Sequence, residues 1–240
     1  MKKPQIVKIY KSGWHLTITL AFIVVPFLFL LVFSKVAGLN TSQLFGDLGI
    51  SFLRLLIAYI IAITLAWILA ASFFRGKRAL IALPFFDVLQ SFPTFAALPI
   101  AVYFLGESNL TVITFLVVTI IGSMLFPIVS SLKLIRFDWE DAVKIYNVHG
   151  WNYVKKFLLP VSVPGLITGS ILGLGNGWQA LIATEIIVQI KSGLGPFFNS
   201  FSSNFTVTAF GILGFLILIF SINRLVWLPL LEKSHRRMEE

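Results

Sequence analysis

Long uncharged runs of apolar residues dominate the chain and separate a few short polar segments. A helix needs roughly 20 apolar residues to cross the hydrocarbon core of a bilayer. Six runs predict such spans, at about 14–34, 55–74, 83–105, 110–132, 165–187 and 207–230. Pro84, Pro93 and Pro99 make the third run irregular, and Glu185 is the one charge in the fifth. The pattern predicts a single transmembrane domain over residues 1–240.

The composition agrees with an all-α integral membrane protein. Hydrophobic residues make up 58% of the chain and charged residues only 12%, against about 25% charged in an average soluble domain. This excludes a soluble globular domain and a disordered chain. A β-barrel is disfavoured, because barrel strands alternate apolar and polar residues over roughly ten positions. The chain has no cysteine and its three histidines are scattered, so no metal site is predicted.

The basic residues predict how the chain is oriented. The net charge is +9, and 15 of the 19 Lys and Arg fall in the two terminal segments and the loops after the second and fourth spans. The outside segments and span ends keep only Lys35, Arg54, Lys191 and Arg224. Basic residues concentrate on the cytoplasmic side of membrane proteins. We therefore expect both termini to be cytoplasmic, and the positive charge to report orientation instead of nucleic-acid binding.

The longest polar segment, about 133–164, carries the most informative pattern. One apolar helical face is predicted from four residues at i, i+3, i+4 and i+7: Trp139, Ala142, Val143 and Tyr146. Asn147 follows this face, and Asn tolerates the left-handed conformation that ends helices. A second short helix is predicted from Trp151 to Leu158, stopped by Pro160 and Pro164. Such faces suit a docking surface for another protein or a loop that lies on the membrane, and the pattern leaves both open.

Within this segment, Asp141-Ala142-Val143, Asn147 and Leu159-Pro160 resemble the EAA loop of binding-protein-dependent ABC importer permeases. Asp141 stands for the usual Glu, Val143 for the second Ala and Asn147 for Gly. Four further stretches are similar to signatures in the second, third and fifth spans of that family, and they are closest to its nitrate/sulfonate/taurine branch: Ser51-Phe52-Leu53-Arg54, Leu89-Gln90-Ser91-Phe92-Pro93, Pro160 to Gly169, and Ala183-Thr184-Glu185.

This resemblance implies a type I-like permease of six transmembrane helices in the cytoplasmic (inner) membrane of a prokaryote. It assigns ATPase coupling to the loop residues Asp141, Ala142, Val143, Tyr146, Asn147 and Pro160. The implied partners are a cytosolic ABC ATPase dimer, a second permease copy or a homologous permease, and an external substrate-binding protein. ATP and Mg would be held by the ATPase, and the chain itself has no phosphate-loop motif. The implied solute is a nitrate-, sulfonate- or taurine-type anion or a small organic compound.

Small and charged residues inside the spans are further candidates. Gly165, Gly169, Gly173 and Gly177 recur every fourth residue, which suits either close packing within the chain or a sliding surface at the pathway or two-fold interface. Glu185 could line the pathway or contact the binding protein, or could pair with Lys191 or Arg54. Arg54 is expected to extend toward the lipid headgroups, and Asp87 to pair with Lys77 or Arg78.

Two other classes of protein compete with an ABC permease. An ion-coupled secondary transporter usually shows inverted repeats and paired carboxylates near the midplane. The sequence has no clear repeat, and Asp87 and Glu185 fall toward opposite faces of the membrane. An intramembrane enzyme needs converging metal ligands or a nucleophile with its base. No such set is visible, so a transport subunit without catalytic residues is predicted.

Overall fold

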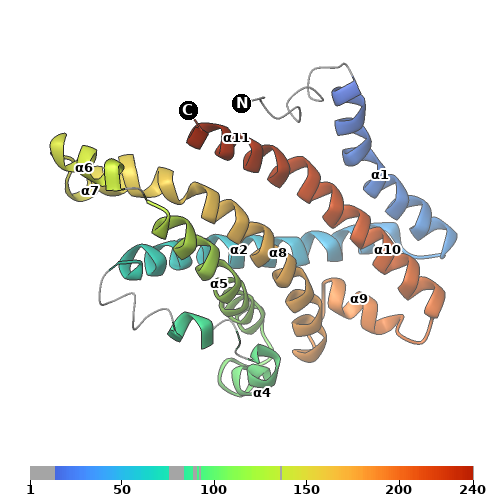
Figure 1. Cartoon of the computed structure of the whole chain (residues 1–240). Helices are drawn as coiled ribbons and strands as arrows, with labels where there is room; N and C mark the ends of the chain where they lie inside the picture. Colours follow the sequence, from blue (N-terminus) through green and yellow to red (C-terminus); the bar gives the residue numbers. More distant parts are fainter. Residues whose placement is uncertain (1–13, 76–83, 89–90, 92, 136, 240) are drawn as a thin grey trace.

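The structure is a computed structural model that describes residues 14–75, 84–88, 91, 93–135 and 137–239, and all regular structure in these ranges is helical. The long elements are α1 (Trp14–Val36), α2 (Thr41–Phe73), α5 (Asn109–Lys133), α8 (Leu159–Ile187) and α10 (Phe205–Ile222). The shorter ones are α4 (Thr94–Leu105), α6 (Phe137–Ile145), α7 (Gly150–Tyr153), α9 (Leu194–Ser200), α11 (Leu228–Glu239), and two π-turns, η2 (Val154–Leu158) and η3 (Asn223–Trp227). The predicted all-α class is confirmed (Figure 1).

Five helical stretches of the described chain are long and apolar enough to cross a membrane: Thr19–Val36, Thr41–Phe73, Asn109–Lys133, Gly150–Ile187 and Phe205–Ser234. They match five of the six predicted spans. In the third, 83–105, α4 covers only 12 residues and begins directly after Pro93. The third predicted span, 83–105, therefore stays a prediction.

Helix α2 begins at Thr41, well before the predicted membrane span 55–74, because the Asn40 side chain accepts a hydrogen bond from the Gln43 N–H and caps it. One predicted helix end is wrong. The helix predicted to stop at Pro160 and Pro164 runs on without a break, since α7, η2 and α8 follow one another directly.

Side chains from two neighbouring helices hold α8 between its prolines. The Trp67 indole N–H of α2 donates to the Ser162 hydroxyl at 2.8 Å, and the Ser131 hydroxyl of α5 donates to the Val161 carbonyl at 3.0 Å. Pro160 and Pro164 lack the N–H groups that would bond to the carbonyls one turn back, and the bonds from Trp67 and Ser131 do not reach those carbonyls. These bonds tie this stretch of α8 to α2 and α5, and the helix continues through both prolines.

Helices α2, α5 and α8 form the core of the molecule. Four alanines spaced four residues apart on α2 are completely buried: Ala58, Ala62, Ala66 and Ala70. On α8, a Cβ added at Gly165 would lie 2.6 Å from the Pro127 carbonyl oxygen, and one at Gly173 would lie 2.9 Å from Cγ of Met124. Gly169 and Gly177 are buried on the same side. The glycine row therefore packs within the chain, and its role at a pathway or two-fold interface stays a prediction.

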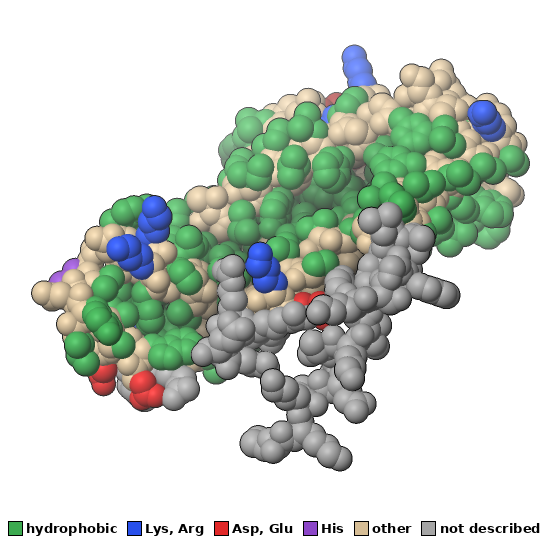
Figure 2. Space-filling model, turned by 90° about the horizontal axis from the view of Figure 1, so that it is seen from above, with side chains coloured by type: hydrophobic (Ala, Val, Ile, Leu, Met, Phe, Trp, Pro, Cys, Tyr) green, Lys and Arg blue, Asp and Glu red, His purple; other side chains and the backbone are tan. Residues whose placement is uncertain are grey.

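Helix α1 pairs with α10 beside this core, and the ends of the helices gather at two places (Figure 1). The rings of Phe22 and Phe220 lie 5.6 Å apart in the α1–α10 contact. Helices α6 and α7 lie where α2 and α5 end, which we call the α6 end. Helix α9 lies where α8 ends and α10 begins, which we call the α9 end. Figure 2 shows hydrophobic side chains over much of one face, with single basic side chains standing out, including at both of its extremities.

Candidate functional site

The predicted coupling segment folds as a short helix with a defined end. Helix α6 stops at Ile145, and Asn147 adopts the left-handed conformation with φ 56°. The Asn147 N–H bonds to the Lys144 carbonyl at 3.0 Å, and the Val148 N–H bonds to the Val143 carbonyl at 3.1 Å. These two bonds are the Schellman pattern that closes a helix. The predicted helix and its left-handed Asn147 are both confirmed.

The tip of this segment carries large apolar side chains that nothing in the described chain covers. Ile145 is 81% exposed, Tyr146 80% and Trp151 75%. Ala142 and Val143 are half-buried beneath them. The Asp141 carboxylate is exposed and accepts a hydrogen bond from the Lys144 ammonium at 2.9 Å, which raises the pKa of Lys144 above its ordinary value. The tip therefore combines uncovered apolar surface with a nearby acidic group.

Two contacts fix the segment to the transmembrane core. Arg75, just beyond the end of α2, forms an ion pair with Glu140 of α6, and its guanidinium lies 4.7 Å from the centre of the Phe74 ring. Trp139 lines a groove of about 460 Å³ together with Pro160 and Pro164 of α8. Pro160 thus lies beneath the coupling segment and away from its exposed tip. The structure places the predicted coupling residues in one region, attached to α2 and α8.

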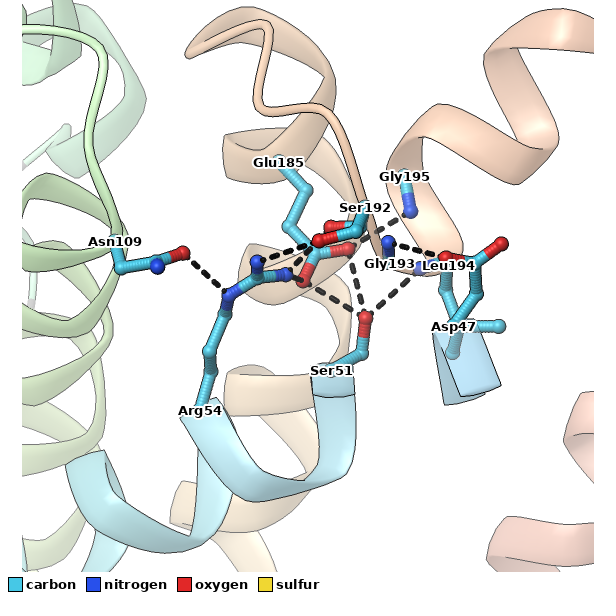
Figure 3. Close-up of polar contacts among 9 residues, drawn as sticks. All are labelled: Asp47, Ser51, Arg54, Asn109, Glu185, Ser192, Gly193, Leu194 and Gly195. Carbon is cyan, nitrogen blue, oxygen red and sulfur yellow. Dashed lines mark hydrogen bonds and ion pairs between the residues drawn. The ribbon is translucent and has the colours of Figure 1, made fainter. Parts of the chain in front are cut away.

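A buried polar cluster occupies the α9 end, centred on Glu185 (Figure 3). The Glu185 side chain is completely buried, and its partner Arg54 is 5% exposed. Arg54 Nη1 donates to Glu185 Oε1 at 2.6 Å, the Ser51 hydroxyl donates to both carboxylate oxygens at 2.8 and 2.9 Å, and the Gly195 N–H donates to Oε2 at 2.8 Å. A buried charge needs such partners, because desolvation costs several kcal/mol per ion. Of the two partners expected for Glu185, Arg54 is the one it contacts.

The remaining bonds of the cluster tie the loop before α9 to α2 and α5. Arg54 donates to the Ser192 carbonyl at 2.8 Å and to Asn109 Oδ1 at 2.9 Å. The Gly193 N–H donates to Asp47 Oδ1 at 2.8 Å, and the Leu194 N–H donates to the Ser51 hydroxyl at 2.8 Å. The expectation that Arg54 reaches the lipid headgroups is wrong, because its guanidinium is buried and donates to Glu185, Ser192 and Asn109.

Sequence reasoning missed most of this cluster. Ser51 and Arg54 are three residues apart, and residues so spaced on a helix share one face, so they could have been taken as one site had α2 been extended to Thr41. Nothing local links them to Asn109 or Gly195. Lys77 and Arg78, the partners predicted for Asp87, lie outside the described residues, so that prediction is untested. No group of three or more potential metal ligands occurs among the described residues.

Comparison with known proteins agrees with this architecture. Residues 62–233 match the family described as the inner membrane component of binding-protein-dependent transport systems. The chain belongs to this family. The permease is 28% identical over 191 residues to a probable ABC transporter permease protein of Brucella melitensis, covering 77% of this chain and 75% of the relative.

Two relatives with named solutes support the predicted branch. The nitrate import permease protein NrtB of Leptolyngbya laminosa is 28% identical over 191 residues, which cover 75% of this chain and 67% of NrtB. The bicarbonate transport system permease protein CmpB of Synechococcus elongatus is 24% identical over 123 residues, which cover 51% of this chain and 44% of CmpB. The predicted family is confirmed, and the relatives are consistent with the nitrate branch. They are transport subunits, which favours the ABC permease over a secondary transporter or an enzyme.

Proposed function

We propose that this permease is one of two transmembrane subunits of an ATP-driven importer, and that it forms half of the pathway for a small solute. The second subunit is another copy or a homologous permease, and an external binding protein delivers the solute. Because the relatives include nitrate and bicarbonate permeases, a small oxyanion or a compound of similar size is the solute class we favour. ATP and Mg are held by a separate cytosolic ATPase dimer.

The observation that carries this proposal is the exposed tip of the coupling segment. Ile145, Tyr146 and Trp151 present apolar surface, while the ordered end at Asn147 and the Arg75–Glu140 ion pair hold the segment in place. A loop lying on the membrane is the other interpretation. Charge does not decide between the two, because Glu140 pairs with Arg75 and Asp141 with Lys144. Membership of the ABC permease family favours a protein partner for the exposed apolar tip.

Charge supports placing the α6 end in the cytoplasm. Six described basic residues belong to segments at that end: Arg75, Lys133, Lys144, Lys155, Lys156 and Lys233. The N-terminal lysines, Lys77, Arg78 and Arg136 lie outside the described residues, and their contribution rests on the sequence alone. An excess of Lys and Arg marks the cytoplasmic side, so we assign both termini and the coupling segment to it.

Co-purification with the ATPase tests this function. The permease is expressed with its companion ATPase, extracted in detergent and captured by a tag. Tyr146→Ala and Asp141→Arg should lose the ATPase. Asn147→Pro should lose it as well, because proline is fixed near φ −65°, whereas Asn147→Gly should retain it, because glycine accepts the left-handed conformation.

Phe205→Ala provides the matched control. Phe205 is 85% exposed at the opposite, α9 end, so truncating it removes a similar amount of exposed apolar surface without touching the coupling segment. It should bind the ATPase as the wild type does. The proposal fails if no ATPase accompanies the wild type, or if Tyr146→Ala and Asp141→Arg bind it unchanged while eluting as folded protein.

A further inference from the structure

One face of α8 is polar and is left uncovered by the described chain. Thr168, Asn176 and Gln179 are all exposed, and Gly175 between them has no atom within 4 Å of an added Cβ. At 100° per residue these four positions fall within roughly 100° of the helix circumference. All four lie inside the predicted span 165–187, and Asn176 is eleven residues from either end of it. Leu172, which is 51% exposed, lies on the same face, so this strip along the middle of a membrane-crossing helix is polar at Thr168, Asn176 and Gln179 and apolar at Leu172.

The described side chains around this strip carry no charge, and those lining the groove at its Thr168 end are mostly apolar, among them Phe126, Leu134 and Trp139. The Asn176 amide donates to the Ser123 hydroxyl of α5 at 2.7 Å. The Gln179 side chain makes no hydrogen bond to any described residue. Toward the α6 end, Thr168 lines a groove of about 610 Å³ with Ser130 and Ser131. The strip thus continues from the centre of the span into an open groove between α5 and α8.

Lipid does not suit this face. An amide moved into hydrocarbon without a partner costs several kcal/mol, and Gln179 has both its donors and its acceptor to satisfy. The exposed side of α2 shows what a lipid-compatible face looks like, since its large exposed residues are apolar, among them Ile57, Ile60 and Ile61. The contrast between these two helices indicates that the α8 strip contacts water or protein.

We propose that this strip lines the solute pathway and that Asn176 and Gln179 supply its hydrogen-bonding groups at mid-membrane. This inference rests on the proposed function. A dry contact with a second permease is the competing explanation of this face, and thiol labelling distinguishes the two. Amides donate and accept hydrogen bonds without a fixed charge. They therefore suit a small polar solute or anion that must bind weakly enough to leave again.

Single-cysteine labelling tests the proposal, because the wild-type chain has no cysteine to remove. Gly175→Cys, Asn176→Cys and Gln179→Cys are compared with Leu216→Cys, which lies on α10 and replaces a side chain that is 55% exposed. The probe is a membrane-impermeant cationic methanethiosulfonate, applied to membranes containing the permease with its ATPase. The three α8 variants should react at least an order of magnitude faster than Leu216→Cys, because lipid excludes the reagent.

An anionic methanethiosulfonate tests the uncharged character of the lining. After both reagents are normalised to their rates with a free thiol, Gln179→Cys should react with each at similar rates. A much slower reaction with the reagent of one charge than with the other would overturn the proposal that the lining is uncharged. Labelling as slow as that of Leu216→Cys would overturn the pathway itself. The pathway assignment would also be overturned if Gln179→Cys formed a disulfide between two copies of the permease and reacted with neither reagent, because that result indicates a dry interface.

Capture of the ATPase from the same membranes separates the two proposals. If the ATPase is absent from wild-type permease, the proposed function fails and this inference falls with it. If the ATPase is present and the α8 cysteines stay unlabelled, only the pathway assignment is wrong.

Discussion

Replacing Glu185 by Gln should destabilise the permease strongly, although the two side chains have nearly the same shape. The carboxylate accepts hydrogen bonds from Ser51, Arg54 and the Gly195 N–H, and it is completely buried. A glutamine offers one acceptor oxygen and an NH₂ group, so at least one of these donors would face another donor. The Arg54 guanidinium, 5% exposed, would lose its counter-charge.

The size of the effect follows from burial. Removing one partner of a buried ion pair costs about 3–5 kcal/mol, because the other charge is left uncompensated. For a chain of 150–250 residues, each kcal/mol shifts the melting temperature by about 2–4 °C. Glu185→Gln should therefore lower the Tm of the detergent-solubilised permease by about 6–20 °C.

Thermal unfolding in detergent, followed by size-exclusion chromatography after heating, measures this shift. Lys191→Gln is the matched control, because Lys191 is an exposed basic residue in the segment between α8 and α9. The Tm of this variant should equal that of the wild type. Adding Arg54→Met to Glu185→Gln should restore part of the loss, since the uncompensated guanidinium is then absent. A Tm for Glu185→Gln within 2 °C of wild type would refute the reasoning about the buried charge (about 1 kcal/mol or less).

The same Tm measurement tests three further contacts. Gly165→Ala should lower Tm, because the new Cβ would lie 2.6 Å from backbone of α5, whereas Gly175→Ala should not; equal values would contradict the packing. Ser51→Ala should cost about 1–3 kcal/mol by leaving the buried Leu194 N–H without its acceptor, and a neutral effect would contradict that bond. Trp67→Phe should lower the free energy of unfolding by about 1 kcal/mol, because the hydrogen bond to Ser162 is lost. A fall in Tm as large as that of Glu185→Gln would show that packing of the indole ring dominates instead.

Local signals in the sequence were sufficient for the coupling segment. The apolar spacing from Trp139 to Tyr146 and the conformational preference of Asn147 act within a few residues, and the structure contains the predicted helix with its left-handed end. Hydropathy likewise located five long apolar helices. These features depend on short-range chemistry, which is why one sequence predicts them.

Features that depend on distant partners were not predictable in this way. Pro160 and Pro164 predict a helix end, but the helix continues through both, and Val161 and Ser162 between them bond to Ser131 of α5 and Trp67 of α2, which are distant in the sequence. Arg54 was predicted to reach the headgroups, whereas in the structure it donates hydrogen bonds to Glu185 and Ser192 at the α9 end. The sequence alone does not determine how α2 and α8 are aligned along each other. It therefore predicted two possible partners for Glu185 without deciding between them.

The unbroken helix from Gly150 to Ile187 has a mechanical consequence. Its 38 residues, at 1.5 Å each, give a rod about 57 Å long, nearly twice the roughly 30 Å of the hydrocarbon core. One end adjoins the coupling segment and the other carries Glu185 with its ties to α2 and the loop before α9. The π-turn η2 and Pro164 lie inside this helix, and helices bend at such features. One continuous helix therefore links the coupling segment to the Glu185 cluster, and its bending points lie near the coupling segment.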